Sequence, residues 1–338
     1  IEVHLGAHWA RVINEPGSVV MDRIASFRKQ LAQELGVVLP RVRFRDMARL
    51  APERYEIHLD GALAGKGEAR PDRLLAIHPA GDTKSIPGEI TRDPTYGLPA
   101  LWIEEEQREA ATRAQFTLVD AATVLMTHLT ELLRRECSTL LSRAEVDRIL
   151  SRVRKTHPGL VEELVPAVLS STEIQRVLQG LLREKVSIRH IEAILETLAD
   201  AGRVTRDTAS LIEACRQRLG TAICQSLVGD AGALQVITLD PVLESQFMES
   251  VQAAAAAGAG SPLVIEPRLA ERLVGRLIQQ SERMMKSNLL PVLLCAPELR
   301  RHVRGLSERL VPHLRVVSMS EVPHNVELKS FGVVQAQP

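Results

Sequence analysis

The chain of 338 residues has few aromatic side chains, few cysteines and no long apolar run. Aromatic residues make up 3% of it, with only two Tyr and two Trp. No stretch of about 18 apolar residues is present, which predicts that no segment spans a membrane. No secretory signal pattern opens the chain, and its start at Ile1 rather than Met indicates a fragment of a longer protein. The cysteines show no CxxC spacing and have apolar neighbours, which favours buried, reduced thiols at Cys137, Cys215, Cys224 and Cys295.

Charge is evenly balanced in the chain. Lys and Arg together number 42, as do Asp and Glu together. A dedicated nucleic-acid-binding protein normally shows a basic excess, so the balance argues against that class. The content of 45% hydrophobic and 25% charged residues is typical of a soluble globular protein. The length suggests roughly two to four compact units.

The sequence also lacks the short motifs that assemble chemistry. It contains no G-x-G-x-x-G, G-x-x-x-x-G-K-[ST], G-x-S-x-G or H-E-x-x-H pattern. His4 and His8 could share a helix face as metal ligands, but Gly6 between them and the missing acidic partner count against this. His128 stands alone late in a predicted helix, which indicates a structural role. The acidic run Glu104–Glu106 indicates the solvent-exposed start of a helix. We therefore expect no enzyme activity, no cofactor and no metal.

Hydrophobic patterns predict a mixture of helix and strand in the first 130 residues. Apolar residues at spacings of three and four predict a helix over 18–35, capped by Ser18 and ended by Gly36. A hairpin turn is expected at Asp60-Gly61 and a helix from Asp120. The Gly-, Pro- and Asp-rich segment 61–106 indicates a small β-rich subdomain, inserted into a discontinuous first subdomain of residues 1–60 and 107–130. Strands are predicted at 42–44, 55–59, 74–77, 101–103 and 116–119, the last returning to the first subdomain.

Residues 131–220 are almost wholly helical in pattern and are predicted to form a helical third subdomain. Ser142-x-x-Glu145 and Ser170-x-x-Glu173 are capping boxes. Ser187 and Asp207 are expected to cap two further helices. Short connections predict that neighbouring helices pack on one another.

The last third, residues 221–338, alternates strands with helices and is predicted to be an open α/β subdomain. Proline is favoured at the first position of a helix, so Pro241, Pro267 and Pro297 should each open one. Asp240 and Glu266 should satisfy the N–H groups where a phosphate would sit, so no phosphate site is expected. Strands are predicted at 236–239, 263–265, 292–295 and 314–317, and a loop or frayed helix end at 253–260. The fold class is thus mixed α/β with four subdomains.

Two of the four largest aromatic side chains stand in a turn-rich loop, residues 93–102. Asp93 before Pro94 is held extended, and Pro99 stiffens the exit of the loop. Trp102 is expected to fill the core of the small subdomain. Tyr96, in the turn, is a candidate anchor, and the loop is interpreted as a shallow apolar pocket, edged by Asp93, that accepts a side chain of a partner.

Several motifs together resemble the cytoplasmic domain of the type III secretion and flagellar export-gate family (FlhA/SctV). They lie at 28–40, 93–103, 119–129, 177–189 and 194–200, and their order and spacing fit over about residues 10–320. The resemblance implies four subdomains, a membrane-embedded portion outside this chain, and assembly into a ring of nine copies. It also implies a place at the cytoplasmic face of the bacterial inner membrane, where the ring meets other export-apparatus components.

The resemblance further implies docking of secretion chaperone–substrate complexes or a gatekeeper protein, and a part in ordering export. Tyr96 stands where flagellar members usually carry Phe. The runs 28–36 and 119–129 resemble flagellar members, whereas 320–329 resembles members from injectisomes, the virulence-associated branch, and we favour the latter. The partner-binding residues implied here are Asp93, Pro94, Tyr96, Gly97, Leu98 and Thr127.

Two rival functions stay open. One is a cytosolic enzyme that uses the C-terminal α/β subdomain, which a nucleotide or metal bound to purified protein would favour. The other is a purely structural ring scaffold without a cargo site.

Overall fold

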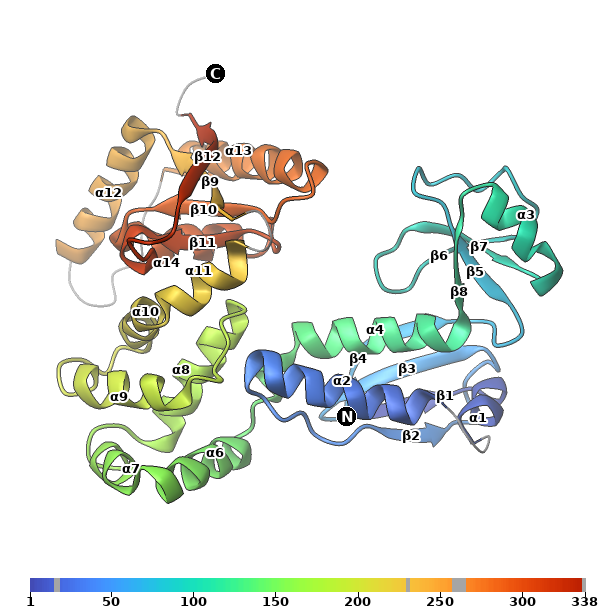
Figure 1. The fold of residues 1–338 in the computed structure, drawn as a ribbon, viewed down its shortest axis with the longest axis horizontal. Coiled ribbons are helices and arrows are strands. Elements are labelled where there is room, and N and C mark those ends of the chain that lie inside the picture. Colours follow the sequence, from blue (N-terminus) through green and yellow to red (C-terminus); the bar gives the residue numbers. More distant parts are fainter. Residues whose placement is uncertain (15–18, 229–231, 257–265, 336–338) are drawn as a thin grey trace. The chain divides into compact units, whose positions relative to one another are not determined.

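The computed structural model describes residues 1–14, 19–228, 232–256 and 266–335 (Figure 1). The predicted cap at Ser18, the predicted strand at 263–265 and part of the predicted loop, 257–260, lie outside these residues. The chain divides into a first unit, Ile1–Glu145, and a second unit, Val146–Pro338. Among the described helices, none is both long and apolar enough to cross a membrane.

The first unit contains a four-stranded sheet in the order β2 (Arg43–Asp46), β1 (Glu2–Leu5), β3 (Arg54–Leu59) and β4 (Ala62–Glu68). Alternate side chains of β1 and β3 are buried on one face of the sheet, and the others lie on the opposite face. The turn between β3 and β4 has the positive φ angles that Asp-Gly predicts, 48° at Asp60 and 82° at Gly61.

Helices α2 (Val19–Leu35) and α4 (Ala121–Arg135) lie side by side, with α4 also against β4 (Figure 1). α4 begins where predicted, because the Asp120 side chain accepts a hydrogen bond from the N–H of Thr123. α2 ends at Gly36, whose φ of 79° confirms the predicted glycine stop. Two shorter helices, α1 (Ala7–Asn14) and α5 (Cys137–Leu140), also belong to this unit.

A second, fully antiparallel sheet has the order β6 (Glu89–Arg92), β7 (Pro99–Ile103), β5 (Leu74–Ile77) and β8 (Thr117–Asp120). Between β7 and β8 the chain forms η1 (Glu105–Gln107), which has no buried residue and confirms the predicted solvated start, and α3 (Arg108–Arg113). Trp102 is 3% exposed, which confirms its place in the interior. One core of this sheet consists of Leu74, Ala76, Ile86, Leu101, Ile103, Ala111 and Phe116.

Strand pairing corrects the predicted boundary between the first subdomain and its insertion. β4 lies beyond residue 60 but pairs with β3 in the first sheet, because the tight turn holds the two strands together. β8 was predicted to return to the first subdomain, but it pairs with β5 in the second sheet. The preceding Phe116 is buried in the core of that sheet and anchors β8 there. The return to the first sheet is made by α4.

Helices follow one another from residue 143 to 228, in agreement with the helical pattern. Ser170 and Glu173 form the predicted capping box, and the Asp207 side chain caps its helix. The prediction for Ser187 is wrong: its hydroxyl accepts from the N–H of Arg189 within the preceding turn, and the next helix starts only at Ile191. The helices are α6 (Arg143–Thr156), α7 (Pro158–Leu164), α8 (Ser171–Arg183), α9 (Ile191–Ala201), α10 (Thr208–Arg218) and α11 (Gly220–Val228).

The rest of the second unit is a parallel sheet in the order β11 (Arg315–Ser318), β10 (Val292–Cys295), β9 (Leu234–Leu239) and β12 (Leu328–Val334). α12 (Pro241–Ala256), α13 (Pro267–Lys286) and α14 (Pro297–Ser307) each begin at a proline, as predicted. Strand β12 was not predicted, because most of its residues are exposed and lack an apolar alternation. The four cysteines of the chain are buried and free, as predicted.

Buried charges connect the helices of the second unit to its sheet. Arg216 on α10 donates to Glu321 Oε2 at 2.6 Å, in η3 (Met319–Glu321), and to Glu184 Oε2 at 3.0 Å. Arg300 on α14 donates to Glu184 Oε2 at 2.6 Å and to Glu213 Oε2 at 2.6 Å. Both guanidinium groups are almost fully buried. We call Glu184, Glu213, Arg216, Arg300 and Glu321 the ionic cluster.

The ionic cluster should make the second unit sensitive to acid. Burial disfavours the charged form of Glu184, but the surrounding arginines, Arg216 and Arg300 foremost, hold its pKa below the ordinary value of 4.5. Because the pKa is lower in the folded chain, the stabilisation is present above about pH 4.5 and is lost as the pH falls through the folded pKa. Calorimetry at a series of pH values below about 4.5 should show that the unfolding temperature falls as the pH falls. In the Glu184→Gln chain the unfolding temperature should depend less on pH. An equally steep fall in the variant would contradict the assignment.

Candidate functional site: a loop over helix α4

The loop between β6 and β7, residues 93–98, projects an aromatic ring into solvent. Tyr96 is 64% exposed and Leu98 is 47% exposed. Asp93 closes the loop: its N–H donates to the Leu98 carbonyl at 2.9 Å, and its carbonyl accepts from the N–H of Gly97 at 2.8 Å. Gly97 has a φ of 69°, a conformation that glycine adopts at little cost. The loop is thus held in one shape before any partner arrives.

The carboxylate of Asp93 faces inward and not toward a partner. Asp93 is only 6% exposed, and its Oδ2 accepts from the N–H of Tyr96 at 2.7 Å. This corrects the expectation that Asp93 edges an open pocket, since the carboxylate is taken up by the backbone N–H that it satisfies. Asp93 is therefore a positioning residue for Tyr96.

Charges on helix α4 act on the hydroxyl of Tyr96. Partial burial and the carboxylates of Glu131 and Asp93 raise the pKa of Tyr96, whereas Arg134 lowers it. Glu131 and Arg134 both belong to α4. The half-buried Thr127 lies four residues before Glu131, on the same face of α4. That the loop and Thr127 form one surface stays a prediction.

Tyr55 and His128 form a buried polar pair behind this surface. Tyr55 Oη lies 2.9 Å from His128 Nδ1, and the two rings meet edge to face. Burial lowers the pKa of His128, so the imidazole is neutral at pH 7 and its Nδ1 can accept from the tyrosine hydroxyl. Burial and the nearby Asp93 carboxylate raise the pKa of Tyr55, which keeps the hydroxyl protonated. His128 therefore has the structural role that the sequence favoured.

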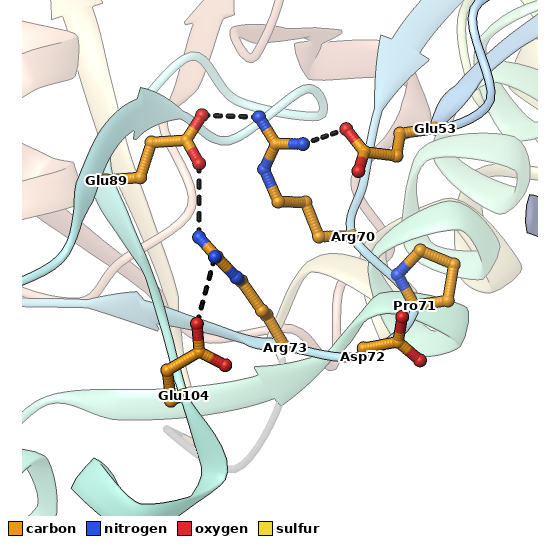
Figure 2. A pocket seen from close by; sticks show the side chains of 7 residues that line it. All are labelled: Glu53, Arg70, Pro71, Asp72, Arg73, Glu89 and Glu104. Atoms are coloured by element: carbon orange, nitrogen blue, oxygen red, sulfur yellow. Dashed lines mark hydrogen bonds and ion pairs between the residues drawn. The ribbon is translucent and has the colours of Figure 1, made fainter.

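A separate hollow in the first unit is lined by four carboxylates and two arginines (Figure 2). Arg70 pairs with Glu53 and Glu89, while Arg73 lies 3.2 Å from Glu89 and 2.9 Å from Glu104. Because both guanidinium groups already have carboxylate partners, the hollow offers little attraction to an anion. The ion pairs of Arg70 instead connect Glu89, on β6 of the second sheet, to Glu53, the residue before β3 of the first sheet.

Two further sequence patterns lie away from this loop. His4 lies on β1 and His8 in α1, so the two do not share a helix face, an arrangement that Gly6 had counted against. Asp240 Oδ1 accepts from the N–H of Val242 at 2.9 Å, as expected, but Glu266 makes no capping hydrogen bond. At the start of α14, the backbone N–H of Ala296 donates to a side chain that is distant in sequence, Glu244 Oε1, at 2.9 Å.

The residues implied by the resemblance differ in exposure. Tyr96, Gly97 and Leu98 are exposed, Pro94 and Thr127 are half-buried, and Asp93 is buried. Sequence reasoning missed Glu131 and Arg134, although their spacing from Thr127 on one helix could have indicated them.

Comparison with known proteins places the chain in a family. Residues 1–327 match the FHIPEP family. The chain belongs to that family. It is 39% identical over 335 residues to the flagellar biosynthesis protein FlhA of Caulobacter vibrioides, covering 99% of this chain and 47% of that protein. It is 38% identical over 318 residues to FlhA of Bacillus subtilis, covering 94% of this chain and 46% of that protein. This FHIPEP chain thus spans about half the length of the curated relatives it matches.

Solved structures share the fold of this FHIPEP-family chain. The Chlamydia pneumoniae CdsV protein matches with a TM-score of 0.83 at 24% identity, covering 99% of this chain and 97% of that one. CdsV in complex with CdsO matches with a TM-score of 0.80 at 23% identity, with the same coverage. Nonameric EPEC SctV-C matches with a TM-score of 0.75 at 22% identity, covering 98% of this chain and 97% of that one. These structures confirm the predicted fold class, and the family match with the FlhA relatives confirms the resemblance to the export-gate family.

Proposed function

We propose that this chain is the ring-forming cytoplasmic domain of a type III protein export gate. In this proposal it sits at the cytoplasmic face of the bacterial inner membrane, docks chaperone–substrate complexes or a gatekeeper protein, and helps to order export. Its membership of the FHIPEP family and its relatives named for flagellar biosynthesis support this function.

The observation that carries the docking proposal is Tyr96. Tyr96 is 64% exposed on a loop held by three hydrogen bonds among its own residues and one from Arg92 at the end of β6, so its backbone has little freedom left to lose on binding. Rigid exposed aromatic side chains are the usual anchors of protein interfaces. Apolar Leu98 beside the ring, and Thr127 and Glu131 on α4, complete a small surface that fits a partner's apolar side chain edged by a polar group.

Ring formation and contact with other export components draw support from proteins of the same fold. One solved structure is a nonamer of SctV-C, and another is a complex of CdsV with CdsO. The curated relatives reported above are flagellar, and their higher identity favours the flagellar branch over the injectisome branch that residues 320–329 had favoured.

We propose a non-enzymatic role. The rival use of the C-terminal α/β subdomain as an enzyme would need an open helix start for a phosphate. At the starts of α12 and α14, backbone N–H groups already donate to Asp240 and Glu244.

The docking proposal predicts that Tyr96→Ala weakens chaperone binding at least tenfold, because truncating a central aromatic anchor commonly costs 2 kcal/mol or more (about thirtyfold). The chain would capture export chaperones from a lysate of the source bacterium, and the affinity of the purified pair would then be measured. Asp93→Ala should also weaken binding, because it removes the oxygen that accepts from the N–H of Tyr96 and so releases the loop. Asp93→Asn keeps an acceptor oxygen and should weaken binding less.

Leu310→Ala is the matched control, since Leu310 is 62% exposed but belongs to the second unit. Its affinity should equal that of the unaltered chain. Equal affinity in the Tyr96→Ala chain would instead remove the proposed surface and favour the purely structural ring.

A further inference from the structure

A group of metal-ligating side chains lies on the first sheet, on the face opposite to the buried Tyr55. His4 on β1 is the cross-strand neighbour of Glu56 on β3, and His58 follows two residues further along β3. Side chains two residues apart on a strand, and those directly opposite across a pair, share a face. The three side chains therefore converge, and their ligand atoms all lie within 4.8 Å of one another.

The two ring nitrogens of His4 have different surroundings. Nε2 lies 3.4 Å from Glu2 Oε2 and can donate to it. Nδ1 is buried, has no hydrogen-bond partner, and lies 4.0 Å from Glu56 Oε2. Histidine ligands of metals commonly donate their second N–H to a carboxylate, which fixes the tautomer and leaves the other lone pair for the metal. Glu2 and His4 have this arrangement.

His58 completes the set from the other side of the carboxylate. Its Nε2 lies 3.1 Å from Glu56 Oε2, and its ring centroid is 4.2 Å from that of His4. The side chains of His4, Glu56 and His58 are 13%, 19% and 14% exposed, so they are mostly shielded but still reachable from solvent. A neutral His4 in this tautomer aims a lone pair at a carboxylate, an arrangement that a cation between them would stabilise.

We propose that His4, Glu56 and His58 bind one divalent transition-metal ion, best matched by zinc, and that Glu2 orients His4. Two imidazoles and one carboxylate form a recurrent zinc ligand set, with water in the fourth position. Tetrahedral bonds of about 2.0–2.1 Å place ligand atoms about 3.3 Å apart, so small side-chain rotations would close the site. The bound ion would cross-link β1 to β3. This site goes beyond the proposed docking function and does not depend on it.

Arg49 is the competitor of the metal. Its Nη2 lies 2.8 Å from Glu56 Oε2, and its side chain is 58% exposed. A guanidinium so close to the ligand carboxylate repels an incoming cation. Removing it at an exposed position should leave the fold intact and tighten metal binding.

The test is a calorimetric titration of zinc chloride into the chelator-treated 338-residue chain. We expect one zinc ion per chain, binding weakened at least tenfold by His4→Asn and by His58→Asn, and binding tightened about threefold or more by Arg49→Ala. His157→Asn is the matched control, since His157 lies 3.3 Å from Glu192 in an exposed pair, and it should leave the affinity unchanged.

Circular dichroism of each variant establishes that it is folded. No zinc binding by the unaltered chain, or unchanged affinity in both folded histidine variants, overturns the proposal. If a histidine variant does not fold, Arg49→Ala decides, because an affinity equal to that of the unaltered chain then contradicts the site.

Discussion

Replacing Glu321 by Ala should lower the free energy of unfolding of the second unit by about 3–5 kcal/mol, because the change breaks a buried ion pair and leaves Arg216 with Glu184 as its remaining carboxylate partner in the ionic cluster. Glu321 is 2% exposed and accepts two hydrogen bonds from the guanidinium of Arg216, at 2.6 and 3.2 Å. It also lies 3.6 Å from Arg300. Because Glu321 is buried, bulk solvent does not replace the lost carboxylate, and both arginines lose part of the negative charge that compensates them.

The chain's aromatic residues provide an internal control for this experiment. The only two Trp residues of the chain, Trp9 and Trp102, lie in the first unit, so tryptophan fluorescence follows that unit alone. Amide hydrogen exchange should show loss of protection in the second unit of the Glu321→Ala chain, with an unchanged fluorescence transition. Glu327→Ala, which removes an exposed carboxylate 3.5 Å from Lys329, should change little. A loss below about 1 kcal/mol for Glu321→Ala would show that the cluster is not a stabilising centre.

Replacing Gly67 by Ala should destabilise the first unit by about 1–3 kcal/mol or more, because the core has no space for the new methyl group. Gly67 on β4 pairs with Tyr55 on β3, and a Cβ at residue 67 would lie 2.3 Å from both Cζ and Oη of the tyrosine. Tyr55 cannot step aside, since it is fully buried, bonded to His128, and packed edge-on against Trp9 with ring centroids 6.1 Å apart.

Tryptophan fluorescence reads this effect directly, because Trp9 is in contact with the displaced ring. The denaturation midpoint followed by fluorescence should fall in the Gly67→Ala chain. Chaperone affinity should fall with it, since Tyr55 pairs with His128 on α4, the helix that carries Thr127 and Glu131 of the proposed docking surface. Gly275→Ala is the control: a Cβ there meets nothing within 4 Å, and alanine favours a helix. An unchanged fluorescence midpoint in Gly67→Ala would contradict the packing described here.

Local signals in the sequence predicted most of the secondary structure. The Asp60-Gly61 turn, the Ser170 capping box and the three prolines that open helices each depend on a few adjacent residues, and each is confirmed. The boundary of the inserted subdomain was wrong at both ends because strand pairing joins residues far apart in sequence. Strand β12 was missed for the same reason: its position is fixed by hydrogen bonds to β9 and not by an apolar pattern of its own.

In the candidate site, too, features set by adjacent residues were predicted and features set by the folded structure were not. A tyrosine among prolines and a glycine pointed to an exposed loop, and the loop geometry agrees. The burial of Asp93 could not be predicted, since it depends on a hydrogen bond to Tyr96 that only the folded loop creates. Similarly, His4 had no visible acidic partner in sequence, yet β-sheet register brings it opposite Glu56. Contacts between strands are invisible to any rule that compares only neighbouring residues.

We propose that the surface around Tyr96 receives an export chaperone. Docking there can be tested by placing a photo-cross-linking amino acid, p-benzoylphenylalanine, at position 96 of the full-length protein in living cells during export. We expect a covalent adduct with a secretion chaperone that is lost when Asp93→Ala is added, and no such adduct from position 310. Chaperone adducts from position 310 but none from position 96 would contradict it.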